Sequence, residues 1–413
     1  MSGGSCNRFV CPLLRNSQFY SILSIAFASL PFLIFIFRGS PICTFWSCCI
    51  LGVTLLNIYA EQREKSLLFE VTRGIQFVLA MLSVLIYYNG SNVVNRYRYS
   101  YRGHDMLYDS ELLSMDEFLL GWLYPRGQLA LYLDTQYEFG VTTQFGRFYA
   151  EILQLLYISY YFWGNAIGVY LAFQYFYYSV YKKQRGTKKR LQWRRIQMFV
   201  TAWVSTFVLN HLVNLCFPAM SPRIFIASEF KNELNGIWLL GGLRNAVTKA
   251  AANTYSAFPS GHCGLSILAA ILSFRIGLQK WYSYLVLVTT VLIVLATQVL
   301  RYHYFVDFLF SIPLVCFGTW LGGFHDKDFY QRCLVELGEE DRDDDGKPML
   351  GTVSSSPIPV NALGEEILPL MAMRGSASPN GENLSPDIEL GRIHQALGGA
   401  ATNITKSSSF EAK

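Results

Sequence analysis

The sequence FPSGH, residues 258–262, opens one apolar segment, and RYHYFVD, residues 301–307, follows another. A third polar stretch, FPAMSPR at 217–223, ends the apolar segment before them. Histidine occurs only six times in 413 residues, yet FPSGH and RYHYFVD each hold one beside groups that suit an oxyanion. Because all three stretches stand where a membrane-length segment meets a polar one, they predict a phosphoryl-transfer site at one membrane face.

The composition favours a membrane protein. Hydrophobic residues make up 52% of the chain and charged residues 15%, whereas a soluble domain carries about 25% charged residues. The net charge is only +5 and the basic residues are clustered, so nucleic-acid binding is not indicated. The nine cysteines show no metal-ligand spacing. We therefore expect neither a metal nor another cofactor.

Apolar segments of about 20 residues predict an all-α fold, a polytopic membrane helix bundle with about eight spans. The fourth segment is long enough for one projecting helix, or for a hairpin that turns at Gly164 and Asn165. The eight predicted spans are 19–37, 41–60, 74–91, 149–181, 197–217, 261–278, 281–300 and 304–323.

Changes in composition divide the chain into three parts. Residues 1–73 are expected to form an N-terminal cytosolic segment and an extra two-span hairpin, and residues 74–323 the membrane core. Within the core, the polar and aromatic segment 92–148 is expected to fold over the membrane surface. Residues 324–413 carry an acidic run and are then rich in Ser, Pro, Gly and Ala, which predicts a disordered cytosolic tail.

The densest basic segment, KKQRGTKKRLQWRR at 182–195, sets the predicted topology. The positive-inside rule places it in the cytosol. Counting spans from there puts all three polar stretches on the lumenal or exoplasmic face. We therefore expect a multi-pass protein of an endomembrane (Golgi or endoplasmic reticulum) or of the plasma membrane, with its site facing away from the cytosol.

Residues in these stretches suit an enzyme that handles a phosphate ester without a metal. Arg223 can donate two hydrogen bonds to phosphate oxygens. Ser260 and Gly261 precede an apolar helix, so a hydroxyl and backbone N–H groups can face an anion there. His262, in the first turn of that helix, can protonate the leaving oxygen.

His303 and Asp307 form the second half of the predicted site. Four residues apart on a helix, they share a face, so the carboxylate can fix the imidazole tautomer and make His303 the better nucleophile. An ionisable residue such as Asp307 inside an apolar span is costly and indicates function. Taken singly, FPSGH is also compatible with ordinary turn chemistry and Arg223 with an interfacial anchor. The order of the three stretches on one face favours the functional interpretation.

At these residues the chain resembles the type 2 phosphatidic acid phosphatase superfamily, membrane lipid phosphatases related to vanadium haloperoxidases, over about residues 74–323. The resemblance implies a six-helix core, a lumenal or exoplasmic site and a phosphohistidine intermediate. The roles that it implies are nucleophile for His303, orienting carboxylate for Asp307, leaving-group acid for His262, and phosphate binding for Arg223, Ser260 and Gly261.

Two positions depart from the superfamily pattern. Thr297 stands where the pattern has an Arg six residues before the nucleophile, and Cys216 where it has a Lys seven residues before the first Arg. Arg301 is a candidate to replace a missing cation as a phosphate binder. HYFVD, FPAMSPR and the segment DEFLLGWLYP at 116–125 look closer to the inositol phosphorylceramide synthase branch. Members of that wider branch move a phospho-headgroup from one lipid to another alcohol.

Three functions remain open on the sequence. The first is a metal-independent lipid phosphotransferase or phosphatase with a phospholipid donor; the acceptor is water or an alcohol such as ceramide, and the two departures favour transfer. The second is a catalytically silent membrane protein that binds lipid or scaffolds partners, which the missing Arg and Lys keep open. The third is a transporter or channel, motivated by Asn210, His211 and Asn214 inside a span.

Overall fold

A computed structural model describes residues 66–177, 187–234, 236–238 and 255–324, with isolated positions between 48 and 59 and at 242–243. These residues lie in the first of two units into which the chain divides, Met1–Val360 and Asn361–Lys413. The predicted spans at 19–37 and 41–60 and the predicted tail after 324 fall outside the described residues, apart from those isolated positions. Part of the basic segment 182–195 also falls outside them.

The described part of the chain is helical and contains no β-strand, which confirms the predicted all-α class. One isolated parallel bridge joins Ala219 to Ser256. The longer helices are α4 (Ser66–Arg102), α5 (Asp109–Leu120), α6 (Leu129–Tyr137), α7 (Gln144–Phe176), α8 (Thr187–Cys216), α11 (Gly261–Arg275), α12 (Lys280–Val299) and α13 (Phe305–Leu321). Short turns of helix are η1 (Gly103–Met106), η2 (Pro125–Gly127), α9 (Pro222–Phe225) and η4 (Ala227–Glu229).

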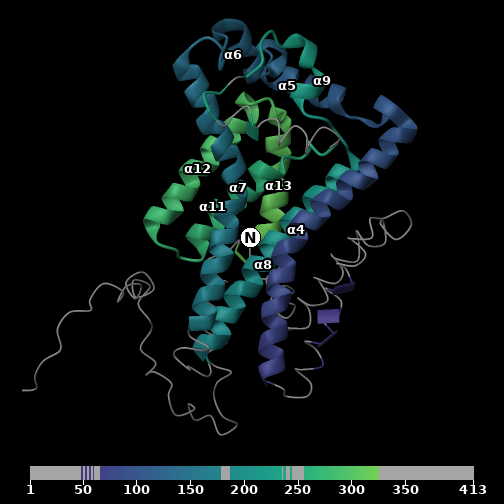
Figure 1. Cartoon of the computed structure of the whole chain (residues 1–413). Helices are drawn as coiled ribbons and strands as arrows, with labels where there is room; N and C mark the ends of the chain where they lie inside the picture. The colour runs from purple at the N-terminus through teal and green to yellow at the C-terminus, as the bar shows by residue number, and fades with distance from the viewer. Residues whose placement is uncertain are drawn as a thin grey trace, which may run out of the picture. The chain divides into compact units, whose positions relative to one another are not determined.

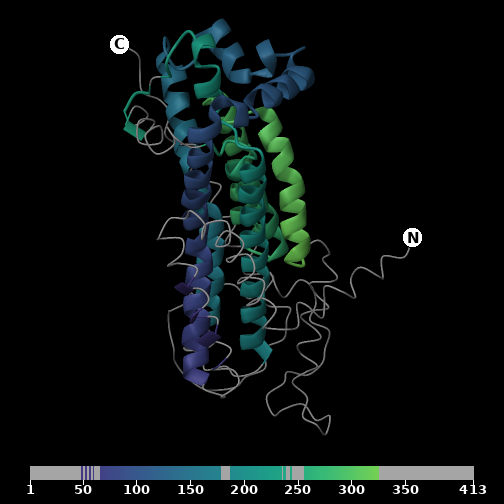
Figure 2. The same cartoon turned by 90° about the vertical axis from the view of Figure 1, so that its right-hand side faces the viewer.

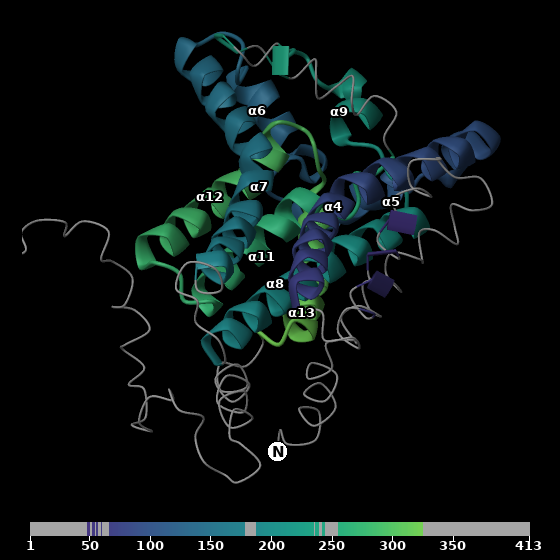
Figure 3. The same cartoon turned by 60° about the horizontal axis from the view of Figure 1, so that its bottom comes forward.

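Helix α11 lies at the centre of a helix bundle, in contact with α7, α8, α12 and α13 (Figures 1 and 3). Its sequence explains this position, because the run GLSILAAIL at 264–272 has small and aliphatic side chains on every side. A helix that is apolar all round is buried. Large side chains of α7 and α8 complete the core around it, among them Leu171, Phe199 and Trp203.

Helix α7 decides between the two alternatives for the fourth predicted span. It runs without interruption from Gln144 to Phe176, and Gly164 and Asn165 lie inside it. Gly164 serves close packing rather than a turn, because a Cβ there would lie 1.9 Å from the Trp203 indole on α8. As far as the structure describes segment 149–181, it is one helix and not a hairpin.

Two of the described helical stretches are long and apolar enough to cross a membrane, Gln192–Cys216 within α8 and Lys280–Val299. They coincide with the predicted spans 197–217 and 281–300. Helices α11 and α13 match the predicted spans 261–278 and 304–323 but are shorter apolar helices. The described residues therefore support a membrane protein, whereas the total of eight spans and the six-helix core remain predictions.

Helices α8 and α13 approach each other closely near the C-terminal end of α13. A Cβ added at Gly318 would lie 1.9 Å from Thr206 Oγ1, and one added at Gly322 would lie 2.7 Å from the Ala202 Cβ. Any larger residue at these two positions would push the backbones apart. The last turns of α13 are therefore seated directly on α8.

The segment between α4 and α7 folds into α5, η2 and α6 at the end of the bundle where α12 finishes and α13 begins (Figure 2). Helix α5 packs against α13, and α6 packs against α12. The loop after α8 and the loop before α11 meet at the same end, because Ala257 N–H donates to Ala219 O at 3.0 Å. The three polar stretches singled out in the sequence are thus gathered at one end of the bundle.

Candidate functional site

Ser260 starts helix α11 and joins it to α13. Its Oγ accepts a hydrogen bond from Cys263 N–H at 3.3 Å, as an N-cap serine does. Its own N–H donates to Asp307 O at 3.2 Å. The next residue is closely packed, because a Cβ at Gly261 would lie 3.3 Å from Asn210 Oδ1. The first turn of α11 therefore lies between α8 and the start of α13.

Amide side chains hold the loop that leads into α11. Asn210 Nδ2 donates to Pro259 O at 3.1 Å, and Asn214 Nδ2 donates to Tyr255 O at 2.9 Å and to Phe258 O at 3.1 Å. These bonds satisfy loop carbonyls that would otherwise be buried without a partner. The polar residues of α8 thus support this loop, which removes their value as a motive for a transport pathway.

Hydrogen bonds also join α8 to the neighbouring helix α4. Asn95 on α4 donates its Nδ2 to Asn214 Oδ1 at 3.0 Å. Ser91, one turn earlier on α4, lies 3.1 Å from His211 Nδ1. Both contacts join α4 to α8 at the level of the loop before α11.

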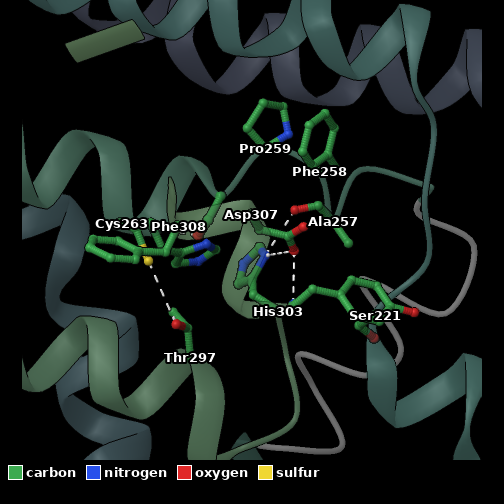
Figure 4. A network of polar contacts seen from close by, with 12 residues as sticks. Ser221, Ala257, Phe258, Pro259, Cys263, Thr297, His303, Asp307 and Phe308 are labelled. Atoms are coloured by element: carbon green, nitrogen blue, oxygen red, sulfur yellow. Dashed lines mark hydrogen bonds and ion pairs between the residues drawn. The ribbon is translucent and has the colours of Figure 1, made fainter. Parts of the chain in front are cut away.

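The imidazole of His303 is fixed by two acceptors on the same ring nitrogen (Figure 4). Its Nδ1 lies 2.8 Å from Ala257 O and 3.1 Å from Asp307 Oδ2. A carbonyl and a carboxylate can only accept, so Nδ1 carries the proton and Nε2 carries the lone pair. Burial lowers the pKa of His303 to about 4, so the ring is neutral near pH 7. This is the tautomer that a nucleophile acting through Nε2 needs.

His262 lies beside His303 in an aromatic stack that the sequence did not reveal. The two imidazole centroids are 5.6 Å apart. The phenol ring of Tyr157, on α7, stacks on His262 at 4.1 Å and on Tyr302 at 4.3 Å. On Tyr302 lies the Arg223 guanidinium, 4.6 Å from the ring centroid. One continuous stack thus connects the predicted leaving-group acid with the predicted phosphate-binding arginine.

Backbone hydrogen bonds bring the Arg223 segment to the same loop. Arg223 N–H donates to Arg301 O at 3.0 Å, and its Nε donates to Ser221 Oγ at 3.2 Å. Pro222, at the first position of the short helix α9, fixes the approach to Arg223. Arg223, Ser260, Gly261, His262, His303 and Asp307 are therefore all brought to one place by the fold.

Arg301, the remaining predicted phosphate binder, has partners elsewhere. Its Nη2 donates to Asp134 Oδ1 at 3.1 Å in an ion pair whose side chains are 5% and 0% exposed. Its guanidinium also lies over the Phe230 ring at 3.9 Å, and Nη1 donates to Asn232 O. Binding phosphate would require Arg301 to break this buried ion pair, which is strongly unfavourable. These contacts give Arg301 a structural role, and Arg223 remains the predicted phosphate-binding arginine.

Two carboxylates of α5 hold the backbone around the site. Asp109 accepts from Met220 N–H at 3.0 Å and from Tyr304 Oη–H at 2.8 Å. Asp116 accepts from Phe305 N–H and Val306 N–H, both at 2.8 Å, and so caps the start of α13. Burial raises the pKa of both carboxyl groups to about 6, although the hydrogen bonds that they accept oppose this.

Thr297, where the resemblance expects an arginine, is a buried residue beneath the site. Its Oγ1 lies 3.6 Å from Cys263 Sγ (Figure 4), and its carbonyl accepts from Tyr302 N–H and His303 N–H. The position therefore shapes the turn before the nucleophile and brings no positive charge to it. Cys216, the other departure, is exposed at the end of α8.

Residues 187–321 match the model of the PAP2 superfamily. The PAP2 match begins at α8 and ends with α13, and it includes every residue predicted for the site. Tyr157, Asp109 and Asp116 lie before it, so this match alone does not point to them.

A PA-phosphatase related-family protein of Dictyostelium discoideum is 35% identical to this chain over 232 residues. The aligned region covers 55% of this chain and 42% of that relative, so the chain spans less than half of the relative's length. No solved structure gives a significant match. Together the two matches support the PAP2 superfamily and, in general terms, a phosphatase or phosphotransferase activity.

Proposed function

We propose that the chain is an integral-membrane lipid phosphatase or phosphotransferase of the PAP2 superfamily, in which His303 Nε2 forms a phosphohistidine. The observation that carries this proposal is the geometry of His303. Ala257 O and Asp307 Oδ2 both accept from its Nδ1, and His262 lies beside its ring. A neutral imidazole held in one tautomer is a competent nucleophile, and the carboxylate stabilises the cation that forms as it attacks.

In the first step, His303 Nε2 attacks phosphorus and the P–O bond to the leaving alcohol breaks. His262 gives a proton to the departing oxygen, so the alcohol leaves neutral and His262 is left as the free base. Arg223 and the N–H groups at the start of α11 face the phosphate oxygens and stabilise their charge in the transition state. Asp307 keeps its charge and stabilises the phosphoimidazolium.

In the second step, an acceptor O–H attacks phosphorus and the N–P bond breaks. His262 now takes the proton of the acceptor, which returns both histidines to their starting states. Water as acceptor releases phosphate or a phosphorylated headgroup, whereas a lipid alcohol such as ceramide yields a new phospholipid. We propose transfer rather than hydrolysis, because Thr297 and Cys216 replace two cations that the phosphatase pattern places around the phosphate.

The same proposal includes the orientation of the site and its independence of metal. The predicted cytosolic location of segment 182–195 places the site end of the bundle on the lumenal or exoplasmic face. Arg223, His262 and the N–H groups of α11 supply the positive charge and donors that a phosphate needs, so turnover should continue in excess chelator.

The test is turnover by the purified full chain on a panel of labelled lipids, scored for free phosphate, released headgroup and headgroup transferred to ceramide. Each lipid is assayed with and without chelator, and with vanadate, whose five-coordinate form resembles the in-line transition state. A His303-linked, acid-labile phosphoenzyme that accumulates before acceptor is added would support the mechanism. A correctly inserted protein that binds lipid but turns over nothing would favour a silent lipid-binding function instead.

A further inference from the structure

We propose that α5 is an interfacial helix whose outward face lies in the boundary between headgroups and acyl chains of the bilayer, on the side of the candidate site. This face, called the α5 stripe here, consists of Met115, Phe118, Leu119, Trp122 and Leu123. None of the residues to which we assign chemistry belongs to the α5 stripe.

The α5 stripe has helical spacing and large exposed side chains. Its members follow the pattern i, i+3, i+4, i+7 and i+8, which places them along one side of a helix and the turn after it. Phe118 is 86% exposed and Trp122 is 81% exposed. Contiguous apolar side chains of this size, facing outward, indicate a contact with lipid or another protein.

A second face of α5, about a quarter of a turn from the stripe, is buried. It buries Leu112 and Leu113 together with the carboxylates of Asp109 and Asp116, which accept from backbone N–H groups around the site. These bonds fix the rotation of α5 about its axis. The stripe therefore cannot turn inward without breaking the cap on α13, so its exposure is built into the fold.

The ends of the candidate spans show what the stripe faces. Asp109, at the start of α5, holds Met220, four residues after the candidate span Gln192–Cys216 ends. Asp116 holds Phe305, six residues after Lys280–Val299 ends. Because both spans finish next to α5, the helix lies at the level where the hydrocarbon region gives way to headgroups. Trp and other aromatic side chains are enriched at that level.

Two details of the stripe suit a lipid surface. The Trp122 indole donates its Nε1–H to Leu119 O at 2.9 Å, so the ring can enter an apolar medium without leaving a donor unsatisfied. Glu111 and Glu117 are exposed on the same helix and would repel anionic headgroups. The lipid that fits is therefore zwitterionic or uncharged.

This placement has a functional consequence that rests on the proposed function. One helix both contacts the bilayer surface and caps the helix that carries Asp307. A lipid substrate would then reach the site from the interface next to α5, with its headgroup already at the height of His303.

Photocrosslinking tests the placement without any assumption about activity. The full chain, in phosphatidylcholine nanodiscs, carries p-benzoylphenylalanine at one position: Phe118 in the stripe, Glu117 on the exposed polar side of α5, or Val291, which is 61% exposed on α12. We expect lipid adducts by mass spectrometry at 118 and 291, with at least about ten-fold less at 117.

Each other outcome overturns the placement. An adduct of position 118 with a second copy, or with another segment of the same chain, would make the stripe a protein contact. Lipid adducts at 291 but not at 118 would place the stripe in water. Equal adducts at 117 and 118 would show that α5 has no lipid-facing side. No adduct at 291 would contradict the membrane spans from which the height of α5 was inferred.

A kinetic arm tests the consequence. The double variant Phe118→Ser, Trp122→Ser should raise the apparent KM for lipid in vesicles by about ten-fold and leave kcat unchanged. A short-chain, monomeric lipid phosphate should show no change in KM. An unchanged KM for vesicle lipid would overturn the route from the interface. If the wild-type chain turns over neither substrate, the proposed function fails while the crosslinking result stands.

Discussion

The loops that carry the two histidines are supported by opposite chemistry. Amide groups of Asn210 and Asn214 donate to carbonyls of the loop before His262. Carboxylates of Asp116 and Asp307 accept from N–H groups of the turn around His303. Both supports are buried, and each satisfies the backbone groups that its loop would otherwise leave without partners.

This difference decides which helix start can bind an anion. Two helices begin at the site, and the first turn of a helix presents N–H groups that favour negative charge. At α13 Asp116 already occupies the N–H groups of Phe305 and Val306. At α11 the supporting amides take carbonyls, which leaves the N–H groups of Gly261 and His262 as the donors that we assign to phosphate. In the proposed mechanism, the loop before α11 thus serves binding and the turn before α13 serves attack.

The largest expected effect distinguishes the proposed nucleophile, His303, from the proposed leaving-group acid, His262. His303→Ala should abolish both turnover and phosphoenzyme, because no other imidazole is held by a carboxylate there. His262→Ala should slow a lipid substrate by about 10²–10⁴-fold, the usual worth of a general acid. With a p-nitrophenyl leaving group, which needs no proton, it should still form phosphoenzyme. Rapid-quench assays on both variants measure this.

The control for the two histidine variants is Thr289→Ala, which changes a buried residue of α12 away from the histidines. Protease mapping checks that every variant is inserted in the membrane. Normal turnover by a well-inserted His303→Ala variant would refute the covalent mechanism. Loss of phosphoenzyme in His262→Ala with the p-nitrophenyl substrate would show that the two loops do not divide the chemistry as argued.

Replacing the carboxylate of Asp116 by an amide, and the amide of Asn214 by a carboxylate, should have the next largest effect. Asp116→Asn turns an amide N–H₂ toward backbone donors, and Asn214→Asp turns a carboxyl oxygen toward two carbonyls. Each leaves buried polar groups mispaired, at a cost of about 1–3 kcal/mol of unfolding free energy. We expect Asp116→Asn to lower kcat and Asn214→Asp to raise KM, measured by steady-state kinetics and thermal unfolding. Ser114→Ala on the exposed side of α5 is the control, and equal effects on both constants in both variants would contradict the division.

The carboxylates of α5 and the amides of α8 should also differ in their response to pH. Burial raises the pKa of Asp109 and Asp116 from 3.8 to about 6. The folded state therefore binds these protons more tightly than the unfolded state, so their contribution to stability is fully present below about pH 4 and is lost as pH rises through about 6. The difference amounts to at most about 3 kcal/mol per carboxyl. The amides contribute nothing, because they do not titrate.

Thermal unfolding of wild type and Asp109→Asn between pH 4 and 7 measures this effect. The wild-type midpoint should fall more steeply with rising pH than that of the variant. The comparison uses the slopes, because the substitution also changes stability at every pH. Parallel slopes would show that Asp109 does not titrate in this range.

The smallest expected effect concerns Tyr157, which touches both loops. Tyr157→Phe keeps the ring between His262 and Tyr302, whereas Tyr157→Leu removes it. An aromatic contact is worth about 0.5–1.5 kcal/mol beyond its buried area, so Tyr157→Leu should lower kcat about two- to ten-fold. Tyr157→Phe should stay near wild type. Steady-state kinetics of both variants measures this, and a larger loss in Tyr157→Phe would assign the role to the hydroxyl.

The sequence predicted the polar stretches well because each is local. FPSGH begins a helix at Ser260, as expected. The spacing of His303 and Asp307 correctly predicted that the two side chains meet, but His303 lies in the turn before α13 and not on the helix itself. The order of the apolar segments predicted the helices α8, α11, α12 and α13. Residues whose role depends on a distant partner were missed. Tyr157 was one tyrosine among 26, and only folding places it against a histidine more than 100 residues away.

Asp116 and Arg301 are two further residues whose roles the sequence alone did not predict. The segment that begins at Asp116 stood out in the sequence, but its acceptor role needs the start of α13, 189 residues later. Arg301 lies two residues before His303 and was a reasonable phosphate binder by proximity in sequence. Its positive φ of 68° and the buried carboxylate of Asp134 direct its guanidinium to an ion pair. Neither fact has a local signal.

Helix α13 would amplify a small tilt at its glycine contact with α8. This contact, which acts as the pivot, is at Gly318, where a Cβ would clash with Thr206, and Asp307 lies near the other end of the helix. The arm between them is 11 residues, about 16 Å at the rise of an α-helix. A tilt of only about 3–4° at the pivot therefore moves Asp307 by about 1 Å, a displacement that can cost about a hundred-fold in rate. In the proposed mechanism, a packing defect far from the histidines would thus displace Asp307 and misorient His303 relative to the phosphorus atom.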